Sequence, residues 1–122
     1  MIKRFTDLDA WKEGHKLVVI IYEITTQFPP EEKYNLVSQS RRAVVSITNN
    51  TAEGFGRFHF KDRLIFYYNA RGSVLEVQNC LLAARDTHVL QSPYDFQRAW
   101  NQSEICYQKL NGLIASTTKR IS

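Results

Sequence analysis

NLVSQSRRAVVSITNNTAEGFG, residues Asn35–Gly56, has the apolar periodicity of one long helix. Small and polar residues continue its apolar face, which indicates close packing against a neighbouring helix. Just upstream, Phe28-Pro-Pro-Glu-Glu favours a helix start, because proline fits the first turn and acids suit the positive helix end. Gly54 and Gly56 predict its end through a left-handed turn. The face comprises Leu36, Val37, Ala43, Val44 and Ile47, continued by Ser40, Asn50, Thr51 and Gly54.

A first helix is expected before this segment, after an extended arm at residues 1–6. Asp7 or Asp9 is its expected cap, and it ends by Pro29, because proline disfavours helical geometry at the preceding residue. Its interior glycine, Gly14, indicates close approach of a neighbouring backbone.

Two more helices are expected after the segment. One runs from near His59 to about Thr87, and the last begins at Ser92-Pro93, with serine as cap and proline in the first turn. A frayed tail is expected at 117–122. Four helices with short links predict an all-α, antiparallel up-and-down four-helix bundle.

The length of 122 residues predicts a single domain, 1–122, with one continuous core. The N-terminus lacks the apolar run of a signal peptide, and no stretch approaches the roughly 20 apolar residues of a membrane span. Cys80 and Cys106 lie inside helical patterns and are expected to be buried free thiols. A cytoplasmic protein is therefore expected.

The net charge of +4 is unevenly distributed along the chain. Between Arg41 and Arg71 there are six basic and two acidic residues, whereas the remainder balances at ten of each. This pattern fits either a polyanion partner or a solvated charged face. The candidates for phosphate contact, expected around one end of the second and third helices, are Arg41, Arg42, Arg57, Lys61 and Arg63.

Aromatic residues alternate with these basic residues. Phe55, Phe58, His59 and Phe60 offer rings for stacking of unpaired bases. Alternatively, the phenyl rings close the end of the bundle or lie in a subunit interface. Exposed aromatic residues on several helices also predict self-association, and they are Tyr22, Tyr34, Phe66 and Tyr94.

Catalysis and metal binding are not predicted. His15, His59 and His88 lie on different segments, and none follows a glutamate at the spacing of a di-iron bundle. Neither a zinc pattern nor a phosphate-binding glycine loop is present in the sequence. No cofactor and no enzymatic activity are therefore expected.

Arg71 interrupts the apolar pattern of the third helix and should find a carboxylate if it is buried. Glu53 and Glu76 are the available partners. An internal ion pair that sets helix register is one interpretation. A polar pocket or nucleic-acid contact lined by Asn50, Glu53 and Arg71 is the other.

Several motifs resemble the four helix bundle protein family, also called 23S rRNA intervening-sequence proteins, which is related to the accessory variability proteins of diversity-generating retroelements. The resemblance covers about Phe5 to Leu90, and the fourth helix matches only in character. It implies a bacterial homopentameric ring whose basic surface binds nucleic acid, without enzymatic activity. The motifs are Phe5-x-Asp7-Leu8-x-x-Trp11, Phe28-Pro29-x-Glu31-Glu32-x-Tyr34, Gln39-x-Arg41-Arg42-Ala43, Asn50-x-Ala52-Glu53-Gly54-Phe55-Gly56-Arg57 and Ala70-Arg71-Gly72-Ser73.

The chain departs from the family pattern at a few positions. Thr48 replaces a proline, which predicts a straighter second helix. Thr51 replaces isoleucine, and Phe58 and Phe60 stand where basic residues are common. The expected function is non-catalytic binding of RNA or DNA phosphates by a homo-oligomer. The rival expectation is an adaptor that recruits a protein partner through exposed aromatic residues.

Overall fold

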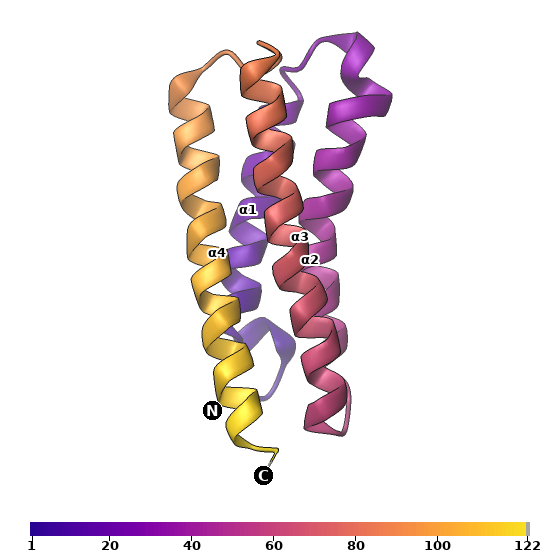
Figure 1. Ribbon diagram of the computed structural model, residues 1–122, viewed down its shortest axis with the longest axis vertical. Helices are drawn as coiled ribbons and strands as arrows, with labels where there is room; N and C mark the ends of the chain where they lie inside the picture. The colour runs from indigo at the N-terminus through magenta and orange to yellow at the C-terminus, as the bar shows by residue number, and fades with distance from the viewer. Residues whose placement is uncertain (122) are drawn as a thin grey trace.

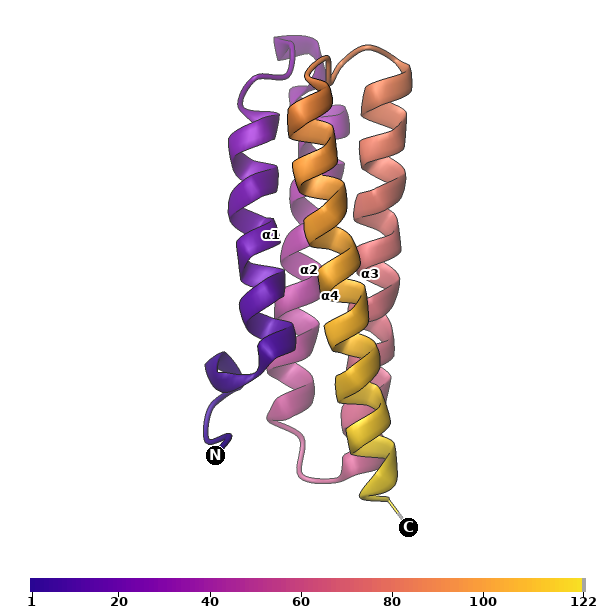
Figure 2. The same ribbon diagram turned by 90° about the vertical axis from the view of Figure 1, so that its left-hand side faces the viewer.

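The computed structural model describes residues 1–121 and confirms the antiparallel four-helix bundle (Figure 1). Each helix packs mainly on its two neighbours, and α1 closes the ring by packing on both α2 and α4. The two chain ends and the α2–α3 turn lie at one end of the bundle (Figure 2). The helices are α1 (Asp9–Thr25), α2 (Ser38–Phe55), α3 (Phe60–Asp86) and α4 (Pro93–Lys119).

The apolar face predicted for the second helix forms part of the core, since Val44 and Ile47 are fully buried. Thr51 is also fully buried, and its hydroxyl donates to the Ile47 carbonyl at 2.7 Å, so the polar substitution leaves no unpaired donor. α4 contributes a buried face of small and aliphatic residues to the core. This face comprises Ala99, Ser103, Cys106, Leu110, Ile114 and Thr117.

The second helix starts with irregular winding, which the sequence pattern did not predict. A short 3₁₀ segment, η2 (Pro30–Glu32), leads into a π-helical turn, η3 (Lys33–Val37), before α2 begins at Ser38. The Glu32 side chain accepts a hydrogen bond from the Leu36 N–H at 3.4 Å. Pro30 thus opens the helical segment as expected, but the predicted regular α-helix at Asn35 is wrong, because Asn35 lies in the π-helical turn.

Gly54 and Gly56 do not form the left-handed turn that was predicted. Gly54 lies within α2, and Gly56 has φ −75° and ψ −9°, which is right-handed. The structure gives Gly54 a different role, because a Cβ there would lie 2.7 Å from Cε1 of Tyr67 and 2.9 Å from Cβ of Phe66. This glycine lets α2 and α3 approach closely. Gly14 also faces a close neighbour, but the nearest atoms are side-chain methyl groups of α2 and not the expected backbone. A Cβ there would lie 3.2 Å from the Thr48 methyl group.

The N-terminal segment differs from the expected extended arm. Residues Phe5–Asp7 form a 3₁₀ turn, η1, and the Asp7 carboxylate accepts from the N–H groups of Lys3 and Arg4 at 2.9 and 3.0 Å. Asp7 thus does not cap α1, and neither does Asp9, which is the first residue of α1 after Leu8.

The start of α4 agrees with the prediction, and its end does not. The Ser92 hydroxyl accepts from the Asp95 N–H at 3.1 Å, which confirms the expected cap. The predicted frayed tail is wrong through Lys119, because α4 continues to that residue and Thr117 is buried. Ser122 lies outside the described residues.

Candidate nucleic-acid interface

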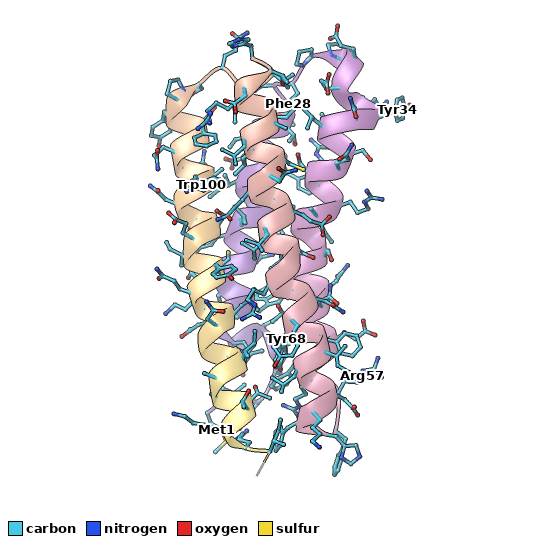
Figure 3. The ribbon with its side chains drawn as sticks, viewed as in Figure 1. Met1, Phe28, Tyr34, Arg57, Tyr68 and Trp100 are labelled. Atoms are coloured by element: carbon cyan, nitrogen blue, oxygen red, sulfur yellow. The ribbon has the colours of Figure 1, made fainter. Side chains whose placement is uncertain are left out.

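The predicted phosphate-contact residues are divided between the two ends of the bundle. Arg41 and Arg42 lie near the start of α2, whereas Arg57, Lys61 and Arg63 lie at the α2–α3 turn. Sixteen helical residues separate Arg41 from Arg57, or roughly 24 Å at the usual rise. The expectation of a single cluster is therefore wrong. Figure 3 shows Arg57 and Met1 at one end and Tyr34 at the other.

Arg41 is occupied by contacts to α1. Its Nε donates to the Thr25 hydroxyl at 2.9 Å, and its guanidinium lies 4.5 Å from the centroid of the Tyr22 ring. A further hydrogen bond reaches the Tyr22 carbonyl at 3.4 Å. These contacts tie α2 to α1, so Arg41 has a structural role. Arg42 is exposed.

The end that carries the α2–α3 turn holds the whole positive excess of the chain. We define this turn end as residues 1–8, 53–64 and 117–121, which the fold gathers together (Figure 1). These segments contain seven basic and three acidic residues, and the remaining nine bases and nine acids cancel. The basic residues of the turn end are Lys3, Arg4, Arg57, Lys61, Arg63, Lys119 and Arg120.

Aromatic rings hold several of these guanidinium groups in place. The Arg63 guanidinium lies 5.3 Å from the Phe55 centroid and 5.1 Å from that of Phe60, and its Nε donates to the Arg57 carbonyl at 2.7 Å. Arg120 lies 5.2 Å from the same Phe60 ring. Because ring faces attract cations, this arrangement limits the motion of two long side chains without neutralising them.

The positive charge of Arg57 is partly neutralised by a neighbouring carboxylate. It pairs with Glu53 at 3.0 Å and lies 4.6 Å from the Phe66 centroid. This pair is exposed on both sides, so it contributes little to stability and can open to a competing anion. Within residues 1–121, by contrast, Lys61, Arg63 and Arg120 form no ion pair with a carboxylate.

The four rings singled out in the sequence have different environments. Phe58 is 87% exposed and His59 packs against its edge, with ring centroids 5.1 Å apart. Phe55 and Phe60 are half-buried at the end of the bundle. Phe55 and Phe60 thus help to close the end of the bundle, whereas Phe58 projects outward, where a base could reach it.

The predicted network around Arg71 does not form. Arg71 donates to the Asn111 side chain at 3.0 Å and lies beside the Tyr68 ring at 5.4 Å, on the α3–α4 side. Glu53 pairs with Arg57, and Asn50 donates to Ser46. Glu76 is exposed. Because Arg71 is only half-buried, it does not require a carboxylate, and the predicted ion pair is wrong.

The side chains that usually bind metal ions are dispersed over the described residues. Across residues 1–121, three or more His, Cys, Asp or Glu side chains do not gather at any point where they could hold a metal ion. Both cysteines are free thiols, and burial raises the pKa of Cys106 to about 12. Over the same residues, none of the helices has the length and apolarity needed to cross a membrane.

Sequence reasoning missed Lys3, Arg4, Lys119 and Arg120. It counted charge along a window of the chain, whereas these residues join the turn end from the two termini. The predicted topology contained the signal, because an up-and-down bundle brings both termini and its central turn to one end.

Comparison with known protein families agrees with this architecture. The model of the family described as 23S rRNA-intervening sequence protein matches residues 6–112. No curated protein matches the chain. The matched region runs from within η1 to the last third of α4, and so extends beyond the motifs quoted above to the fourth helix. The chain therefore belongs to the 23S rRNA-intervening sequence protein family.

Proposed function

We propose that this protein is a non-catalytic, cytoplasmic accessory protein that binds the phosphate backbone of nucleic acid through its turn end. The observation that carries the proposal is the gathering of the entire net charge at that end. Lys61, Arg63 and Arg120 there are available to phosphates, as they have no carboxylate partner within residues 1–121. Phosphate oxygens are the usual partners of such groups in nucleic-acid complexes.

Self-association into a ring, with five copies favoured by the family resemblance, is part of this proposal. The outer face of α3 carries three exposed apolar side chains at helical spacing, Ile65, Tyr68 and Leu75, which are 57%, 46% and 50% exposed. Apolar stripes of this kind are typical of interfaces. In an assembly the turn ends would act together, and linked weak sites bind far more tightly than single ones.

The assembly can be tested by native mass spectrometry. The expected result is a single oligomeric mass for the unaltered chain and dissociation on Leu75→Glu. Val19→Glu is the matched control, because Val19 is 46% exposed but lies on α1 and not on the apolar stripe of α3. A monomeric mass for the unaltered chain would contradict self-association.

Nucleic-acid binding can be tested by fluorescence anisotropy with labelled RNA and DNA over a range of salt concentrations. The double variant Lys61→Ala/Arg120→Ala should weaken binding and lower the slope of log affinity against log salt by about 0.7–0.9 for each phosphate that the variant no longer neutralises. Lys33→Ala/Arg42→Ala removes the same charge from the opposite end and should leave binding unchanged.

Two results would refute this proposal. One is the absence of binding to RNA and DNA at low salt. The other is an equal loss of affinity in both double variants, since it would show that net charge matters and its location does not. An adaptor that recruits an apolar protein partner would instead associate independently of salt.

A further inference from the structure

We infer that the turn end contains a pocket for one unstacked nucleotide, so that the protein binds single-stranded segments in preference to duplexes. This inference rests on the proposed function and specifies its ligand. The pocket is a hollow of about 620 Å³ between the N-terminal segment, the α2–α3 turn and the end of α4. That volume lies within the roughly 300–1,000 Å³ of small-ligand sites.

The walls of the hollow suit a flat aromatic group, which can stack on an aromatic ring or on the guanidinium planes that lie over Phe55 and Phe60. They are formed by Phe55 and Phe60 from the α2–α3 turn, by Ile2, and by Leu113 from α4. Tyr67, whose ring is 1% exposed overall, also contributes to the lining. Nucleic-acid bases stack on aromatic side chains with little regard to base identity, because every base has a π-face. The site should therefore accept a base without strong sequence preference.

The charged groups of the hollow suit a phosphate attached to that base. Arg63 and Arg120 both contribute to the lining. Both guanidinium groups lie within 5.2 Å of the Phe60 centroid, so they are at most about twice that distance apart. An anion in the hollow would be attracted by both guanidinium groups. An unstacked nucleotide matches this arrangement, because the apolar walls suit its base and the two guanidinium groups suit its phosphate.

A base within a duplex does not meet these requirements. It is stacked on both faces, and its extrusion from the helix costs free energy. A single strand needs no such extrusion. Duplex RNA can still contact the exposed basic residues of the turn end through its backbone. The pocket therefore adds affinity for single strands to an electrostatic attraction that both forms share.

The test compares a fluorescent RNA of about twelve unpaired nucleotides with the blunt duplex of the same sequence, using the full chain at low salt. The single strand should bind about tenfold more tightly, as expected for stacking of one base. Ser116 lines the hollow and is exposed, so Ser116→Phe should fill the space without disturbing the core. This variant should abolish the single-strand preference and leave the duplex affinity within about twofold.

Two further variants support the comparison. Asn101→Phe adds the same ring at another exposed position of α4 and should change neither affinity. Phe60→Leu removes a stacking wall instead of filling the hollow. Because the Phe60 ring also holds Arg63 and Arg120, this variant should weaken single-strand binding more than duplex binding. Circular dichroism confirms that each variant keeps its helices.

The experiment distinguishes failure of the pocket from failure of the proposed phosphate-binding function. Equal affinity for both RNAs, or an equal effect of Ser116→Phe on both, would overturn the pocket and leave the phosphate-binding function standing. If neither RNA binds the unaltered chain, the proposed function fails and this inference fails with it.

Discussion

Gly54→Ala tests whether α2 and α3 pack as closely as the structure shows. The added methyl carbon would lie 2.7 Å from Cε1 and 3.0 Å from Cδ1 of Tyr67, and 2.9 Å from Cβ of Phe66. Neither neighbour can easily move, since the Tyr67 ring is buried and the Phe66 Cβ is fixed to the backbone of α3. Reaching an ordinary contact of 3.4 Å requires a shift of about 0.7 Å between the two helices.

The size of the effect follows from two opposing terms. Overpacking a well-packed site costs about 1–3 kcal/mol, and the rigidity of the neighbours places this case at the upper end. Alanine gains back up to about 1 kcal/mol in helix propensity. We therefore expect a net loss of about 2 kcal/mol in the free energy of unfolding. For a chain of this length, that corresponds to a decrease in Tm of about 8 °C.

Gly112→Ala is the matched control. Apart from its chain neighbours and the backbone of α4 itself, no atom of the described residues lies within 4 Å of the position its Cβ would take, so only the propensity gain remains. This variant should raise the stability by about 1 kcal/mol. Both variants are measured by urea and thermal unfolding at one fixed protein concentration, because self-association makes Tm concentration-dependent. If Gly54→Ala proved as stable as Gly112→Ala, the close approach of α2 and α3 would be refuted.

Three further outcomes are expected. The Cys106 thiol, whose pKa burial raises to about 12, should resist a disulfide reagent at pH 8 until urea unfolds the chain, and rapid labelling of the folded protein would disprove its burial. A hydrogen bond from Gln102, aided by Lys16, lowers the pKa of Glu13 from 4.5. This carboxylate therefore stabilises the fold fully above about pH 4.5, and the contribution is lost as pH falls through the lower folded-state pKa. Urea unfolding of Glu13→Gln should accordingly show a shallower decline in acid, and an unaltered decline would argue against the contribution. Arg41→Ala should lower stability by about 1 kcal/mol through loss of its bond to Thr25. It should leave RNA affinity unchanged in the anisotropy assay, and a clear fall in affinity would return Arg41 to the phosphate-contacting residues.

The glycines show where sequence patterns stop being informative. A glycine near the end of a helical pattern fits either a left-handed turn or a close contact between helices, and the two roles have the same local sequence. The left-handed interpretation of Gly54 failed because the deciding atoms belong to Tyr67 and Phe66, on another helix. The Arg71 prediction failed for a similar reason, as its degree of burial depends on how α3 and α4 pack.

The sequence by itself determined the number, approximate bounds and direction of the helices. Helical periodicity and the serine and proline that begin α4 act over a few residues, so they can be read without knowing the fold. It also determined the size of the charge excess and the residues that carry the family resemblance.

Tertiary structure alone decided where that charge lies and what it surrounds. Helix length separates Arg41 from Arg57, although both belong to one basic stretch of sequence. Antiparallel packing brings Arg120 to within 5.2 Å of Phe60, sixty residues away along the chain. Electrostatic attraction depends on distance in space, and so the candidate site exists only once the helices have packed.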